Sequence, residues 1–305
     1  MKRFGSQFAA FLLMPALMIV PMLTVAQSIP TAAQLQSHLE EFLEWKSTNS
    51  GGVDFEVKNI PLDEGNMTSV ALVAEDVDLD EVTVVLANPS NWCEMMFLHL
   101  NVKACIFNET EGNQWVRLYM GRKFYQPPDK AEELQLNFKT GVTDDGVSWA
   151  ELTAAEGPYG TSDYYIGLYA IKADAGVYTE FLSSQKVGAA ATAAQDLYFH
   201  TLAANKIGFT VVGENWRGKP QYAKGQQGAL ERNIVRYLLA LEVYLMKHHL
   251  EGLAGLQERA FDWYDATELY KKQLHEVAKK DYLKAKTKEY QNQVALQAEI
   301  NQVQN

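Results

Sequence analysis

The sequence lacks the short motifs by which catalytic sites are most often recognised. It has no Gly-Lys-Ser/Thr phosphate loop, no G-x-G-x-x-G after a strand, no G-x-S-x-G elbow and no H-E-x-x-H helix. No repeat with the period of a solenoid or propeller is visible. We therefore predict no catalytic residue, no metal ligand and no cofactor.

Basic residues are also scarce. The 305 residues include 27 Lys and Arg against 38 Asp and Glu, which gives a formal net charge of −11. Nucleic-acid binding depends on the neutralisation of phosphates by lysine and arginine, so an acidic chain is a poor candidate for it. We predict no nucleic-acid partner.

Cysteine is limited to Cys93 and Cys105. No residues nearby complete a four-ligand metal set, so a structural disulfide is the interpretation we favour. A reactive thiol or a metal pair is the alternative. Closing a loop of this length would stabilise the fold by about 3 kcal/mol.

The N-terminus has the pattern of a secretory signal peptide. Lys2 and Arg3 precede a long apolar stretch, and small residues allow cleavage after Ala26. Pro15 and Pro21 argue against the alternative, an uncleaved membrane-spanning helix. Cleavage would leave about 280 residues, enough for one substantial core and an appendage. We expect a periplasmic or secreted protein.

Eight segments have the composition of β-strands, and turn residues at regular spacing between the last six predict an antiparallel meander. The segments are 54–60, 67–78, 102–108, 115–126, 133–140, 147–155, 164–172 and 178–187. Bulky residues occupy both faces of the fourth segment, with Val116 and Leu118 on one side and Trp115 and Tyr119 on the other. This pattern predicts a sheet that is covered on one face and lines a cavity on the other.

Apolar residues at helical spacing predict several helices around these strands. Residues 28–50 contain a short amphipathic helix, which we interpret as a packing arm, with a lid or a partner-binding helix as the alternative. Two short helices follow the second strand, the second of them capped by Ser90 or Asn91. We expect a helix at 189–205, a strand at 206–212 and a loop at 213–228.

The strongest helix signal lies at residues 229–250. Ile234, Leu238, Leu241 and Leu245 repeat at i, i+4, i+7 and i+11. Arg236 lies near its start, where the helix dipole disfavours a cation. Salt bridges to the strands are the interpretation we favour for it, and a polar handle for a lipid-like ligand at the mouth of a cavity is the alternative.

The tail after residue 250 is helical, polar and rich in lysine. Residues 268–289 carry seven lysines against four acids. A solvated helix is the interpretation we favour, and peripheral contact with an anionic membrane is the alternative. His248 and His249 point about 100° apart on a helix, so we do not expect them to share a metal ion.

The order of these elements resembles the START-like helix-grip superfamily, also called the polyketide-cyclase or SRPBCC group. The residues that carry the resemblance are Val77–Val82, then 86–92 (LANPSNW), and the helix 229–245 (ALERNIVRYLLALEVYL). The resemblance implies an α+β fold in which a curved antiparallel sheet wraps around a long C-terminal helix. It also implies an apolar cavity between sheet and helix for a lipid-like molecule.

We divide the chain into a signal peptide (1–26), an N-terminal arm (27–62), a helix-grip domain (63–250, with an insertion at 189–228) and a helical extension (251–305). The favoured function is an exported carrier of an apolar small molecule. Nine residues are expected to line the cavity: Ile234, Leu238, Leu241, Leu245, Tyr237, Arg236, Trp115, Trp149 and Tyr165.

Two other functions stay open. An enzyme acting on an apolar substrate would need an ionisable group in the cavity, for which Arg117, Arg122, Glu151, His99 and Arg236 are the candidates. An interaction module would use the helical tail as its partner-binding element.

Overall fold

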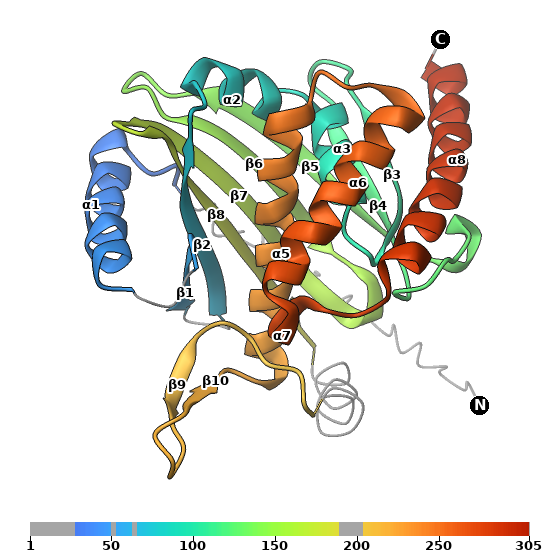
Figure 1. The fold of residues 1–305 in the computed structure, drawn as a ribbon. Helices are drawn as coiled ribbons and strands as arrows, with labels where there is room; N and C mark the ends of the chain where they lie inside the picture. The colour runs from blue at the N-terminus through green and yellow to red at the C-terminus, as the bar shows by residue number, and fades with distance from the viewer. Residues whose placement is uncertain (1–27, 50–52, 63–65, 189–203, 305) are drawn as a thin grey trace, which may run out of the picture.

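The computed structural model describes residues 28–49, 53–62, 66–188 and 204–304 (Figure 1). The signal peptide predicted at 1–26 and the helix predicted at 189–205 lie outside these residues, apart from the last two positions of that helix. The helices are α1 (Ala32–Thr48), α2 (Leu79–Leu86), α3 (Pro89–Phe97), α5 (Gly225–Lys247), α6 (Gly252–Leu269), α7 (Lys271–Leu274) and α8 (Lys279–Gln304). None of the described helices combines the length and apolar composition that a bilayer crossing requires.

Eight strands form one antiparallel sheet in the order β1-β2-β8-β7-β6-β5-β4-β3. They are β1 (Glu56–Pro61), β2 (Asn66–Glu75), β3 (Val102–Asn108), β4 (Trp115–Met120), β5 (Glu132–Val142), β6 (Ser148–Glu156), β7 (Thr161–Ala173) and β8 (Gly176–Val187). Every strand from β3 to β8 pairs with its sequence neighbour. The predicted meander, the α+β class and the C-terminal helices are therefore confirmed.

The two faces of the sheet carry separate apolar clusters because side chains alternate along each strand. On β2, Val70 and Leu72 join the main core, whereas Met67 and Ala71 pack on the opposite face. Figure 1 shows α5 lying across the first face and α1 against the other. The amphipathic α1 is thus the packing arm that the sequence predicted.

A tight turn joins the two longest strands. Gly176 has φ of +145°, and a Cβ there would lie 2.0 Å from the carbonyl oxygen of Ala74 on the neighbouring strand. Only glycine combines this backbone conformation with so close an approach. The turn therefore fixes the register of β2, β7 and β8 at this end of the sheet.

Several sequence predictions need correction. Residues 206–210 are not part of a strand, and the strand expected at 115–126 ends with β4 at Met120. Residues 213–228 are not one loop but contain a hairpin of β9 (Val211–Glu214) and β10 (Pro220–Tyr222). Asn215 closes its turn by accepting hydrogen bonds from the amides of Arg217 and Lys219, and α5 then starts at Gly225. The cap of α3 is Asn88, whose side chain accepts from the Ser90 amide.

The disulfide between Cys93 and Cys105 is confirmed. It joins α3 to β3, with 5.1 Å between the two Cα atoms. Both cysteines are buried in the main core. A disulfide of this kind suits an oxidising compartment.

Candidate functional site

The apolar stripe of α5 lies in the interior of the protein. Ile234, Leu238, Leu241 and Leu245 are at most 4% exposed and belong to the main core cluster. Tyr237 is part-buried, and its ring stacks on His99 at 5.0 Å between centroids. The structure therefore brings these five expected cavity residues together beneath the sheet, packed against other side chains.

Three other residues expected in that cavity lie on the opposite face of the sheet. Trp115 packs in the small cluster beneath the C-terminal end of α8, and Trp149 and Tyr165 pack in the cluster beneath α1. The hydroxyl of Tyr165 donates to Glu151 Oε1 at 2.8 Å. Strand alternation separates these residues from α5, since odd and even positions point to different faces. Ligand contact at any of the nine residues stays a prediction.

Arg236 forms a salt bridge, but its partner is not on a strand as the favoured interpretation expected, because Glu276 lies between α7 and α8. Its guanidinium donates to the carbonyl of Leu274 at 3.1 Å and lies 3.4 Å from Glu276. Burial lowers the pKa of Arg236 to about 10, and the Glu276 carboxylate opposes that shift. The side chain ties α5 to the segment between α7 and α8 and does not reach the groove described below.

The helix α8 runs along β3, an edge strand of the sheet (Figure 1). Gln293 accepts a hydrogen bond from the Cys105 amide at 2.7 Å. Gln297 accepts from the Phe107 amide at 2.9 Å and donates to the Phe107 carbonyl at 3.0 Å. Four helix residues advance about 6 Å and two strand residues about 6.7 Å. Side chains four residues apart on α8 therefore reach backbone amides two residues apart on β3.

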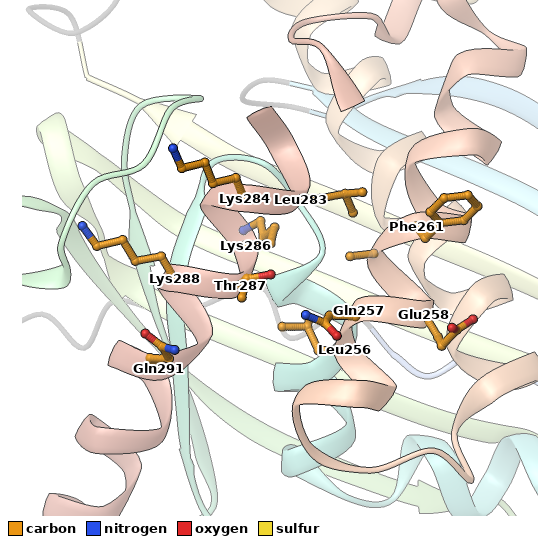
Figure 2. Close-up of a pocket in the computed structure, with 11 residues that line it drawn as sticks. Leu256, Gln257, Glu258, Phe261, Leu283, Lys284, Lys286, Thr287, Lys288 and Gln291 are labelled. Carbon is orange, nitrogen blue, oxygen red and sulfur yellow. The ribbon is translucent and has the colours of Figure 1, made fainter. Parts of the chain in front are cut away.

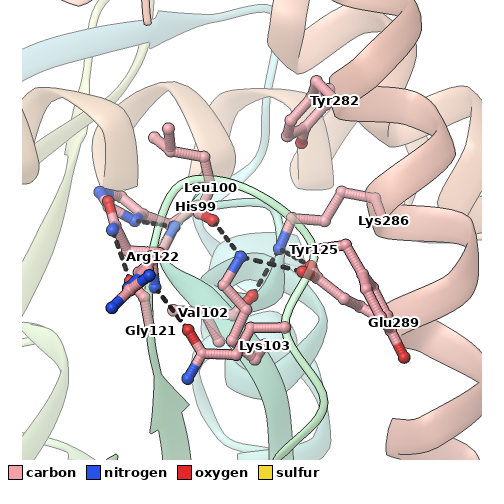
Figure 3. A network of polar contacts seen from close by, with 12 residues as sticks. His99, Leu100, Val102, Lys103, Gly121, Arg122, Tyr125, Tyr282, Lys286 and Glu289 are labelled. Atoms are coloured by element: carbon pink, nitrogen blue, oxygen red, sulfur yellow. Dashed lines mark hydrogen bonds and ion pairs between the residues drawn. The ribbon is translucent and has the colours of Figure 1, made fainter. Parts of the chain in front are cut away.

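Buried charges hold the first half of α8 against the same strand (Figure 3). Lys103 on β3 lies 2.9 Å from Glu289. Lys286 lies 3.1 Å from Glu289 and donates to the Val102 carbonyl at 2.5 Å. All three side chains are at most 2% exposed, so two cations share one carboxylate away from water.

The cost of this arrangement appears in the lysine pKa values. Burial lowers the pKa of Lys286 to about 8, although the Glu289 carboxylate favours its charged form. Burial also lowers the pKa of Lys103, against the same carboxylate. The position of α8 thus depends on one carboxylate that compensates two ammonium groups.

A groove of about 630 Å³ lies between α6 and α8 (Figure 2). Its buried floor is formed by Leu256 and Ala260 of α6, with Leu283 of α8 half-buried beside them. Polar residues surround this floor: Gln257 and Glu258 on α6, and Lys284, Thr287, Lys288 and Gln291 on α8. An apolar floor with a polar rim can hold a molecule that has an apolar body and a charged end.

The rim of the groove carries a surplus of positive charge. Lys284 and Lys288 on α8 and Glu258 on α6 are the exposed charged residues that line the groove. The two lysine side chains point away from α6 (Figure 2), and the Glu258 carboxylate is paired with Lys247 at 3.2 Å. The stem of Lys286 lines the wall, while its ammonium group takes part in the buried network. The groove is therefore suited to an anionic end group.

The candidate catalytic groups lie outside this groove. Burial lowers the pKa of His99 well below its usual value, so the ring is neutral beneath α5. Arg117 donates to Gln135 on the exposed side of the sheet, and Glu151 accepts from two tyrosines. Among the described residues no group of three His, Cys, Asp or Glu side chains could hold a metal ion.

Part of the groove was indicated by local sequence patterns. Leu283 belongs to the apolar stripe of the tail, and the surplus of lysine near it was visible. The position of α6 depends on Arg259, whose guanidinium is ion-paired with Glu94 on α3 and donates to the Leu250 carbonyl at 2.6 Å. Contacts so distant in the chain leave no local pattern.

Comparison with known proteins gives little further guidance. No family model and no curated protein matches the chain. Among solved structures, the chain is similar to a STAR-related lipid transfer protein (fragment 25–204) from Xanthomonas axonopodis. The TM-score is 0.36 at 12% identity, over 49% of this chain and 88% of that one. A likeness of this size carries no argument about the ligand, so the function must be argued from the groove.

Proposed function

We propose that the protein binds a lipid-like molecule with an apolar chain and an anionic end in the groove between α6 and α8. The observation that supports this proposal is the groove itself. Its volume of about 630 Å³ lies in the range of roughly 300–1,000 Å³ that is common for small-molecule sites. Its floor is apolar, so binding would remove both floor and ligand from water.

The polar rim supports an orientation for the ligand. Lys284 and Lys288 lie on one side of α8, one helical turn apart. Their side chains point away from α6 (Figure 2). A carboxylate or phosphate would therefore lie at the outer edge of α8 to interact with the ammonium groups, while the chain extends over Leu256, Ala260 and Leu283.

The space between the sheet and α5 is the alternative location. A ligand there would have to displace side chains such as Leu238 and Leu241, which are 0% and 2% exposed. Separating a packed core costs several kcal/mol for each large side chain that loses its contacts. The groove needs no such rearrangement, and we therefore favour it.

Catalysis is the less supported alternative. The residues that line the groove include none of the five ionisable groups that the sequence suggested, which are Arg117, Arg122, Glu151, His99 and Arg236. A binding protein for an amphipathic anion is the function that this geometry supports best.

Titration calorimetry with oleate tests the proposal. We expect saturable binding to the wild type and at least tenfold weaker binding to Gln257→Trp, whose indole would fill the groove from its exposed rim. Leu269→Trp is the matched control, because Leu269 is 79% exposed on the same helix and outside the groove. It should bind oleate as the wild type does.

Two outcomes would contradict the proposal, and a third would disqualify the variants. Equal oleate affinity of the wild type and Gln257→Trp would show that oleate binds at another site. A loss in both tryptophan variants would indicate damage to the fold. No oleate binding, together with no apolar molecule in mass spectrometry of an organic extract from the native host, would rule out a lipid-like ligand.

A further inference from the structure

Three lysines form a continuous exposed stripe on α8. Lys280, Lys284 and Lys288 lie at i, i+4 and i+8, and all three are exposed. Within the described part of the chain, none of them has a carboxylate oxygen within 4 Å, whereas Lys279 lies 2.6 Å from Asp265. The stripe therefore carries positive charge that the protein itself does not pair.

The neighbouring acids do not neutralise this stripe. Glu289 is turned inward to Lys103 and Lys286, which leaves Asp281 as the exposed acid in this half of the helix. Like charges at i, i+4 destabilise a helix unless an external anion faces them. The arrangement is notable in a chain whose net charge is −11.

Exposed aromatic rings lie on both sides of the stripe. Phe124 and Tyr125 follow β4 and are 60% and 36% exposed; with Ala285 and Lys288 they line a second hollow of about 370 Å³. The ammonium of Lys288 lies 3.9 Å from the centroid of the Tyr125 ring. On the other side, Phe261 at the groove is 48% exposed.

We propose that this face, formed by Lys280, Lys284, Lys288, Phe124, Tyr125 and Phe261, docks on the surface of an anionic phospholipid membrane. The lysines provide attraction to lipid phosphates, and the rings can enter the headgroup region, where aromatic side chains are favoured. Charge alone would suit an acidic protein equally well. The exposed rings on both sides of the lysines favour the membrane.

The inference does not rest on the proposed ligand. Docking uses the outer surface of α8, the segment after β4 and Phe261 at the edge of the groove, whereas the ligand would occupy the floor formed by Leu256, Ala260 and Leu283. Gln257→Trp should therefore lose oleate and keep membrane binding. The remaining acidic surface is screened beyond about 10 Å at moderate salt and does not prevent the approach of a basic face.

Vesicle co-sedimentation tests the inference, with the protein purified in the form that the cell produces and with no fatty acid present. We expect strong partition to vesicles of equal parts phosphatidylglycerol and phosphatidylcholine, and weak partition to phosphatidylcholine alone. Each lysine near an anionic surface contributes about fivefold, so Lys280→Gln, Lys284→Gln and Lys288→Gln together should weaken the partition about 100-fold.

The control replaces three exposed lysines on other elements, Lys139→Gln, Lys172→Gln and Lys219→Gln, which changes the net charge equally. This variant should partition as the wild type does. About 1 M salt screens the charges and weakens the partition of the wild type. In the same salt, Phe124→Ala should partition more weakly than the wild type.

Several outcomes would overturn the inference. These are equal losses in the two triple variants, equal partition to both kinds of vesicle, or no partition at all. Binding of polyglutamate to the wild type without binding to vesicles would assign the face to an acidic protein instead.

Discussion

At the scale of single residues, Glu289 is the critical charge of the fold. It is fully buried and compensates both Lys103 and Lys286. Removing one partner from a buried ion pair leaves an uncompensated charge, which typically costs about 3–5 kcal/mol. We expect Glu289→Gln to lose about that much free energy of unfolding, measured by urea denaturation.

Lys286→Met is the informative counterpart, because it leaves the pair of Lys103 and Glu289 neutral and keeps an unbranched side chain against Phe97. We expect its stability to be within about 1 kcal/mol of the wild type, or above it. A loss as large as that of Glu289→Gln would show that the Lys286 hydrogen bond to Val102 matters more than the charge balance.

The lysine pKa also predicts a dependence of stability on pH. Burial lowers the pKa of Lys286 from 10.5 to about 8 in the folded state, so the unfolded chain binds more protons between these two values. Stability should therefore rise with pH in that window, by at most roughly 3 kcal/mol from this residue. Below pH 8 Lys286 is protonated in both the folded and the unfolded state, so the folded state bears the full free-energy cost of burying its charge.

Urea denaturation of the wild type and Lys286→Met at several pH values measures this effect. The difference between their free energies of unfolding should shift in favour of the wild type as pH rises from about 8 to 10.5. Using the difference removes the contributions of tyrosines and other groups shared by both proteins. A difference that is constant across the window would contradict a lowered pKa for Lys286.

At the scale of elements, local patterns predicted the strands and helices well, and contacts between distant segments explain the failures. The segment predicted at 102–108 coincides with β3, and α5 begins four residues before the predicted start at 229. The hairpin β9–β10 was missed because the Asn215 side chain, not an apolar alternation, defines its turn. Trp115 shows most clearly what local patterns do not predict. Alternation along a strand predicts that the side chains point to two faces, but it does not predict which helix covers each face.

The α8 helix also protects the edge of the sheet, a role that the polar sequence of the tail concealed. An unprotected edge strand exposes backbone groups that can pair with another chain. Replacing both Gln293 and Gln297 with alanine removes three hydrogen bonds to β3. We expect a loss of about 1–3 kcal/mol in the free energy of unfolding and concentration-dependent self-association.

Chemical denaturation and light scattering measure these two effects. Gln291→Ala is the control, since Gln291 is exposed on the same helix and lies away from β3. Its stability and its monomeric fraction should match the wild type. If the double variant stays monomeric and loses no stability, then α8 does not depend on its glutamine contacts to cover the edge.

At the scale of the whole molecule, one helix connects three features. The α8 helix covers the β3 edge, forms one wall of the groove and carries the basic stripe. Lys284 and Lys288 belong both to the groove rim and to the proposed docking face. Docking would therefore place the groove near the membrane surface, where an amphipathic ligand could enter without crossing bulk water.

This arrangement predicts transfer of a fluorescent fatty acid between vesicles that contain phosphatidylglycerol. We expect the wild type to increase the transfer rate. Gln257→Trp should lose the increase while it still binds vesicles, because its groove is filled. Lys280→Gln combined with Phe124→Ala should lose it at about 0.1 M salt while oleate affinity is retained, because neither residue lines the groove. If Gln257→Trp transfers the fatty acid as fast as the wild type, the groove does not carry the ligand. If the variant with Lys280→Gln and Phe124→Ala transfers it as fast as the wild type, docking is not part of the exchange.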